Sequence, residues 1–104
     1  MNATPAPVVI LISGRGSNLQ AILTETRAGR LPIEVRAVIS NNREAEGLQH
    51  ARAAGVPVEI VDHRAYSERA QFDAALMQAI DRHAPRLVLL AGFMRILGAA
   101  FIHH

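Results

Sequence analysis

The chain has 104 residues, 50% of them hydrophobic and 19% charged, which is typical of one globular domain and excludes a disordered segment. It contains no Cys, so a disulfide framework and a Cys-ligated zinc or iron–sulfur site are excluded. The net charge is only +2, and its scattered Arg residues do not form a nucleic-acid footprint. Without a long apolar run or a secretory signal, the sequence favours a soluble cytoplasmic protein.

The first predicted element is a strand over residues 8–12, a continuous apolar run of the kind that is buried on both faces of a parallel sheet. The strand ends in the Gly-rich turn Ser13-Gly14-Arg15-Gly16. Either Ser17 or Asn18 is then expected to cap a helix that reaches about residue 27 and stops near residue 29. That helix presents an apolar face at residues 19, 22 and 23.

The rest of the chain continues this alternation of strands and helices. The predicted elements are a strand over 33–39, a helix over 43–54, a strand over 57–61, a helix over 67–83, a strand over 86–91 and an apolar end over 93–104 with at least a helical turn. Such an order predicts an α/β fold, with a Rossmann-like open, mainly parallel sheet and helices on both faces. We expect residues 1–7 to be frayed and residues 8–104 to form the domain.

Ligands of open parallel sheets bind beyond the carboxyl ends of the strands, which here are followed by loops 13–18, 40–43, 62–67 and 91–97. In the first loop, Gly14 and Gly16 allow positive φ and a close approach of the backbone to a ligand. The N–H groups of Gly16, Ser17 and Asn18 stand at the start of a helix, where an anion such as phosphate is favoured. The alternative is a tight turn in which the two glycines serve only the geometry.

The other loops leave alternatives open. Loop 91–97 is apolar and suits a flat heterocycle, although core packing is an equal alternative, and Arg95 within it needs a partner or a ligand. His63 is either a general base or a solvated loop residue, and Arg64 and Arg69 are either anion ligands or surface charges. The two adjacent histidines at 103–104 are more consistent with exposed side chains than with a metal site, so no metal is expected.

Three segments carry a family resemblance: VILISGRGSNLQAI over 9–22, VRAVISN over 35–41 and AGFMRIL over 91–97. Together they resemble the glycinamide ribonucleotide formyltransferases of the 10-formyltetrahydrofolate-dependent formyltransferase family. That family transfers a formyl group to phosphoribosylglycinamide in de novo purine synthesis. The resemblance runs from about residue 8 to the end of the chain and implies a Rossmann-like fold.

The resemblance implies a role for individual residues. Gly16, Ser17 and Asn18 match the positions that hold the ribonucleotide phosphate. The folate pocket is matched by Arg69, Met94, Arg95, Ile96 and Leu97, with Arg64 as a rival for the position of Arg69. The implied co-substrate is 10-formyltetrahydrofolate, without a metal, a nucleic acid or a membrane.

The family's catalytic Asn, His and Asp come after the match to residue 101, so the resemblance assigns no catalytic residue within this chain. The chain corresponds to the N-terminal, substrate-binding half of the family's enzymes, and we expect no formyl transfer by this chain alone. The alternatives are a non-catalytic phosphate- or folate-binding module and one half of a split enzyme. In each case an apolar border near the last strand is expected to favour self-association or association with a C-terminal half.

Overall fold

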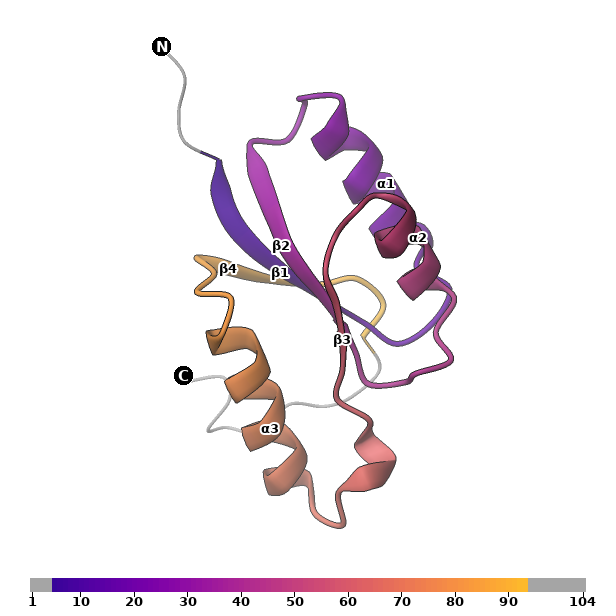
Figure 1. Cartoon of the computed structure of the whole chain (residues 1–104), viewed down its shortest axis with the longest axis vertical. Coiled ribbons are helices and arrows are strands. Elements are labelled where there is room, and N and C mark those ends of the chain that lie inside the picture. Colours follow the sequence, from indigo (N-terminus) through magenta and orange to yellow (C-terminus); the bar gives the residue numbers. More distant parts are fainter. Residues whose placement is uncertain (1–4, 94–104) are drawn as a thin grey trace.

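The computed structural model describes residues 5–93, in which four strands alternate with three helices (Figure 1). The strands are β1 (Ala6–Ile12), β2 (Ile33–Ser40), β3 (Val58–Ile60) and β4 (Leu87–Leu90). The helices are α1 (Ser17–Arg27), α2 (Gly47–Ala53) and α3 (Arg69–Asp81), with a short 3-10 turn, η1 (His63–Ala65), before α3.

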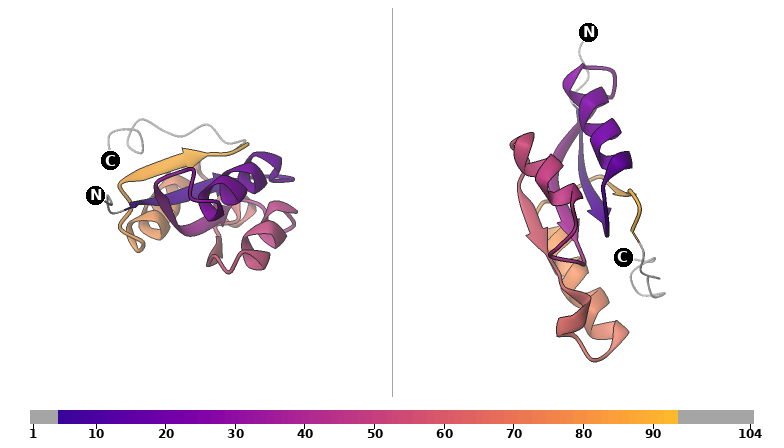
Figure 2. Two further views of the ribbon diagram at one scale, coloured as in Figure 1. Left: turned by 90° about the horizontal axis from the view of Figure 1, so that it is seen from above. Right: turned by 90° about the vertical axis from the view of Figure 1, so that its right-hand side faces the viewer.

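The strands form one sheet in the order β3-β2-β1-β4, and every neighbouring pair is parallel. The residues from Val8 to Ile12 in β1 are completely buried, as predicted for a strand covered on both faces. β4 borders the sheet beside β1, which the left view of Figure 2 shows. The predicted parallel, Rossmann-like α/β fold is therefore confirmed.

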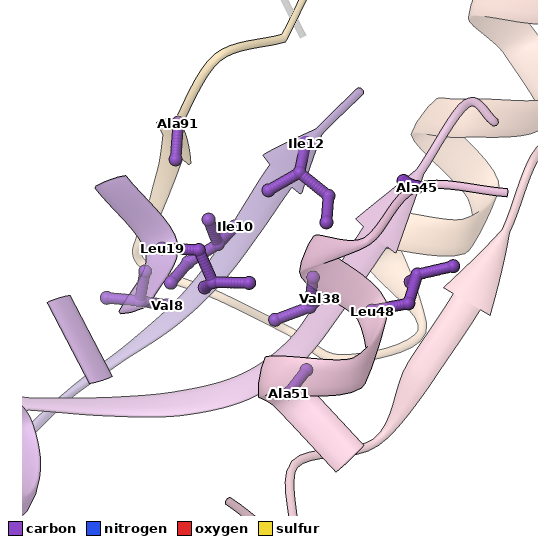
Figure 3. Close-up of a cluster of buried hydrophobic side chains, with 9 residues drawn as sticks. All are labelled: Val8, Ile10, Ile12, Leu19, Val38, Ala45, Leu48, Ala51 and Ala91. Atoms are coloured by element: carbon purple, nitrogen blue, oxygen red, sulfur yellow. The ribbon is translucent and has the colours of Figure 1, made fainter. Parts of the chain in front are cut away.

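Successive side chains of β1 point to opposite faces of the sheet and so divide the core into two clusters. On one face Val8, Ile10 and Ile12 pack with residues of α1 and α2, including Leu19 and Leu48 (Figure 3). On the other face Val9 and Leu11 pack with the apolar side of α3, whose buried residues include Phe72 and Leu76. Helices thus cover both faces, as predicted.

The boundaries differ from the predictions where backbone hydrogen bonds extend or shorten an element. β1 begins at Ala6, since the Ala6 N–H donates to the Pro32 carbonyl and Ala6 and Pro7 pair with β2. These two residues therefore belong to the sheet and not to a frayed end. β2 extends one residue further than predicted, whereas β3 and β4 are shorter at both ends.

Two helices are shorter than predicted. α2 starts at Gly47 and not at residue 43, because Asn42 Oδ1 accepts the Glu44 N–H in a local turn that competes with the helix. α3 starts at Arg69 because Glu68 is extended, with φ −128° and ψ 146°. The helix ends before Ala84, whose φ of 47° and position before a proline are incompatible with continuing it.

The predicted apolar border lies at β4, where Leu87 is 53% and Leu90 58% exposed. Large apolar side chains on an edge strand are a surface on which another chain or segment can pair. The predicted helical turn within residues 93–104 falls on a stretch of which only Phe93 lies within the described residues. No helix within residues 5–93 is both long and apolar enough to cross a membrane.

Candidate anion site at the carboxyl edge of the sheet

The loops that follow the strands all lie at one edge, because every strand runs in the same direction. β1 and β2 lie side by side in the middle of the sheet, so the loops at 13–16 and 41–46 are neighbours across this edge. This is the position at which open parallel sheets bind their ligands.

Gly16 is the residue that turns the chain from β1 into α1. It is the N-cap of the helix and has φ 78° and ψ 28°, a left-handed conformation, and no side chain caps the helix. The prediction that Ser17 or Asn18 is the N-cap is therefore wrong: both lie inside the first turn. Gly14 also differs from the prediction, because its φ is not positive.

The start of α1 has the geometry of an anion site. The first hydrogen bond of the helix runs from the Gln20 N–H to the Gly16 carbonyl at 2.8 Å. The N–H groups of Ser17 and Asn18 precede this bond and have no place in the helical ladder. Both residues are exposed, and α1 carries no acidic side chain in its first turn that would compete with an anion.

A second glycine lies directly against this loop. A Cβ built on Gly16 would come within 2.5 Å of the Cα of Gly47, and the Gly47 N–H donates to the Gly14 carbonyl at 3.0 Å. The first turn of α2 and the loop between β1 and α1 are thus in backbone-to-backbone contact. A side chain at Gly16 would require the backbone of Gly47 to shift, and one at Gly47 would meet the end of the Ile12 side chain and crowd the backbone of the loop.

Side-chain hydrogen bonds join three of the loops beneath the site. Ser13 Oγ donates to Asn41 Oδ1 at 2.6 Å, and both residues are buried. His63 Nδ1 lies 2.9 Å from the Asn41 carbonyl oxygen and 3.4 Å from Asn41 Nδ2. Because a carbonyl oxygen only accepts, the shorter contact places the proton on Nδ1. His63 therefore holds the end of β2, a role that is neither of the two alternatives, general base or solvated loop residue, that the sequence offered.

The two candidate arginines differ in their partners. Arg64 donates from Nε and Nη2 to the two carboxylate oxygens of Asp62, both at 3.1 Å. These hydrogen bonds from Arg64 lower the pKa of the Asp62 carboxyl to about 2. Arg69, the first residue of α3, is exposed and forms no side-chain hydrogen bond or ion pair with the rest of the 5–93 region. Of the two guanidinium groups, only that of Arg69 is therefore without an acidic partner among residues 5–93.

The remaining predicted site residues, Met94, Arg95, Ile96 and Leu97, lie outside the described residues, as do the two histidines at 103–104. The structure thus brings Gly16, Ser17 and Asn18 together, while it leaves the predicted folate residues of the last loop untested. Across the described stretch, no group of three or more His, Asp or Glu side chains is placed to hold a metal ion.

Ser13 and Asn41 lie in two of the loops predicted beyond the strands, at 13–18 and 40–43, but no role in the site was assigned to them, and Gly47 was not singled out at all. The sequence did contain an indication for Gly47. A glycine inside a predicted helix lowers the stability of that helix, which suggests that close packing requires a glycine there. The hydrogen bond between Ser13 and Asn41 spans 28 positions of the chain and had no such signal.

The chain is similar in sequence and in structure to proteins of one known family. Residues 6–104 match the formyl transferase family. The chain belongs to that family. Among sequences, the chain is 46% identical to the phosphoribosylglycinamide formyltransferase of Escherichia coli over 97 residues, which make up 93% of this chain and 46% of that protein.

Two further relatives show how the family segment occurs elsewhere. The trifunctional purine biosynthetic protein adenosine-3 of Homo sapiens is 41% identical over 93% of this chain and only 10% of its own length. The structure of the phosphoribosylglycinamide formyltransferase of Coxiella burnetii superposes with a TM-score of 0.93 at 49% identity, covering 96% of this chain and 47% of that one. The chain therefore spans about half the length of the bacterial relatives that it matches.

Proposed function

We propose that this chain binds phosphoribosylglycinamide and 10-formyltetrahydrofolate as the N-terminal part of a phosphoribosylglycinamide formyltransferase in de novo purine synthesis. The observation that carries the proposal is the start of α1, where Gly16 turns the chain and the N–H groups of Ser17 and Asn18 lie outside the helical ladder at the sheet edge. The names of the E. coli and C. burnetii relatives supply the substrate class. The cytoplasmic location expected from the sequence goes with this metabolic role.

In this proposal Gly16, Ser17 and Asn18 hold the phosphate of the ribonucleotide. Backbone N–H groups at a helix start donate to phosphate oxygens without depending on a side-chain rotamer, and the helix dipole adds to the attraction. The exposed Arg15 in the same loop adds positive charge near the anion. The support is local geometry together with the family match over the same residues.

We assign Arg69 and residues 94–97 to the folate. Arg69 is exposed at the start of α3 and without an acidic partner among the described residues, which suits a carboxylate of the co-substrate. Arg64 is the weaker candidate, because binding a ligand would cost it the two hydrogen bonds to Asp62. Met94, Arg95, Ile96 and Leu97 keep the role that the family resemblance implies.

The reaction proposed for the whole protein is direct formyl transfer. The amine nitrogen of the substrate bonds to the formyl carbon, the bond from that carbon to the folate nitrogen breaks, and the proton lost by the amine balances the one gained by the folate. We assign none of these proton transfers to a residue of this chain. We propose that the chain binds both substrates and that transfer requires association with the part that the bacterial relatives have outside the matched half.

The exposed border at β4 supports such an association. Leu87 and Leu90 are more than half exposed on an edge strand, where a further strand would cover them. Self-association through the same border is the competing outcome for the isolated chain. A non-catalytic binding module would share the phosphate site and differ only in showing no transfer with a C-terminal half.

The test compares two substitutions that add the same charge to the exposed first turn of α1. Asn18→Asp places a carboxylate at the proposed phosphate position, and Gln20→Glu places one at the first residue whose N–H is already bonded within the helix. Two like charges about 4 Å apart repel each other by roughly 1 kcal/mol in water and by roughly 4 kcal/mol at a partly shielded protein surface. Such a repulsion corresponds to a loss of affinity of about tenfold or more. Calorimetric titration with phosphoribosylglycinamide gives the affinities.

We expect Asn18→Asp to weaken binding at least tenfold and Gln20→Glu to change it by less than about threefold. Asn18→Asp is not expected to destabilise the fold, since an acidic side chain in the first turn interacts favourably with the helix dipole. The dephosphorylated ribonucleoside is the ligand control and should bind both variants like the wild-type chain. Wild-type affinity for the phosphorylated ligand in Asn18→Asp would contradict the proposed site.

A further inference from the structure

The contact between Gly47 and the loop before α1 has a consequence for binding. Gly47 is buried at the first position of α2, and α2 packs with α1 on the same face of the sheet. A glycine at a helical position with ordinary φ lowers helical stability compared with alanine. The presence of glycine there therefore points to another feature of the fold.

That feature is the conformation of the anion loop. A Cβ on Gly47 would lie 2.7 Å from Cδ1 of Ile12, 3.1 Å from Cα of Gly16 and 3.3 Å from the carbonyl oxygen of Gly14. The first of these neighbours is the end of a side chain. The other two are backbone atoms of the loop, so they move only if the loop moves.

The same glycine also fixes the loop by a hydrogen bond. Its N–H donates to the carbonyl of Gly14, the second residue after the end of β1, at 3.0 Å. On the other side of the contact, Gly16 keeps φ 78° and has no room for a Cβ against Gly47. The two glycines thus define one arrangement in which the N–H groups that follow Gly16 point away from the sheet edge.

We propose that Gly47 is a positioning residue for the phosphate site: it lets the first turn of α2 lie against the loop at residues 14–16 and holds that loop in its anion-binding conformation. The inference rests on the proposed function, because it assigns a support to the same phosphate site. Gly47 does not touch the phosphate in this account. It acts through the backbone of Gly14 and Gly16.

The first test is Gly47→Ala in the complete 104-residue chain, with inorganic phosphate and ribose 5-phosphate as ligands. We expect the dissociation constants to rise about tenfold, because the new Cβ displaces the loop. Ala51→Gly is the matched control, since it changes one methyl group in the same helix and the same buried cluster. It should lower the midpoint of thermal unfolding while leaving both dissociation constants within twofold of wild type.

A double variant separates positioning from simple overpacking. Ile12→Val removes the Cδ1 atom that is nearest to the new Cβ, so Gly47→Ala/Ile12→Val relieves the side-chain contact but not the two backbone contacts. Compared with Gly47→Ala alone, we expect the double variant to have a higher midpoint of thermal unfolding and the same tenfold loss in affinity. Recovery of both stability and affinity would overturn the inference, as would a single variant Gly47→Ala that binds phosphate within twofold of wild type.

A further test uses the wild-type chain and so does not depend on whether a variant folds. Binding at one site must stabilise a contact that favours that binding, because coupling between two equilibria is reciprocal. Saturating phosphate should therefore slow hydrogen exchange of the Gly47 N–H several-fold, with no change at the Gly55 N–H, which donates to Arg52 at the other end of α2. Unchanged exchange at Gly47 in a chain that binds phosphate overturns the positioning role alone, and a wild-type chain that binds neither ligand overturns the proposed phosphate site as well.

Discussion

The close approach of Gly16 to α2 predicts a graded response to alanine at three glycines. Gly14 has no positive φ and no atom within 4 Å of an added Cβ. Gly29 has φ +79° with the same open space, whereas Gly16 has φ +78° and a Cβ position 2.5 Å from a backbone atom of Gly47. The three positions therefore separate the backbone strain from the steric contact.

The magnitudes follow from these two contributions. The left-handed conformation costs an alanine roughly 1–2 kcal/mol, which applies to Gly29→Ala and Gly16→Ala alike. Crowding adds about 1–3 kcal/mol for Gly16→Ala alone. The expected losses of unfolding free energy are within about 0.5 kcal/mol for Gly14→Ala, roughly 1–2 for Gly29→Ala and about 2–5 for Gly16→Ala.

The assay is urea unfolding followed by circular dichroism, with all three variants measured beside the wild-type chain. A common slope against urea would show that the variants differ in stability and not in the surface exposed on unfolding. The reasoning is refuted if Gly16→Ala is no more destabilising than Gly29→Ala, because the contact with Gly47 would then have no energetic effect.

Three further predictions concern the rest of the sheet edge and the border. Ser13→Ala and Asn41→Ala should each cost about 1–3 kcal/mol, and the double variant should cost about 1 kcal/mol less than their sum; additive losses in unfolding titrations would argue against their hydrogen bond. Because the pKa of Asp62 is about 2 in the folded chain, its stabilising contribution is complete above the ordinary value near 3.8 and is lost as pH falls to about 2. The stability difference between wild type and Asp62→Asn should therefore shrink steadily as the pH falls from about 4 to about 2, and a difference that stays constant over that range would be inconsistent with the lowered pKa. Leu87→Lys and Leu90→Lys should reduce concentration-dependent light scattering without lowering the unfolding midpoint, since both side chains are exposed on β4; unchanged scattering would show that the border does not mediate association.

Much of the fold could be predicted because the buried positions of strands and helices form recognisable apolar patterns in the sequence. The uninterrupted apolar run in β1 indicated a strand covered on both faces, and residues 8–12 are completely buried. The apolar spacing in α3 likewise predicted the face that contains Phe72 and Leu76. The order of strands and helices then sufficed for the parallel sheet.

The details of the site were less accessible, because they depend on contacts between distant segments. A local turn at Asn42 removed the first four residues from the predicted helix, and competition of this kind has only a weak signal in helix propensity. The sequence indicated an anion loop at residues 13–18 but placed the cap one or two residues late. Nothing local indicated that Gly47 would lie against Gly16, since that approach depends on how α2 packs on the sheet.

The most direct test of the phosphate site is the amide spectrum of the complete chain, labelled with nitrogen-15 and titrated with phosphoribosylglycinamide. The account predicts that the largest shifts occur at the amides of Gly16, Ser17 and Asn18. The amide of Gly29, at the opposite end of α1, should remain in place. Saturable shifts that cluster away from residues 16–18, with none in that loop, would contradict it.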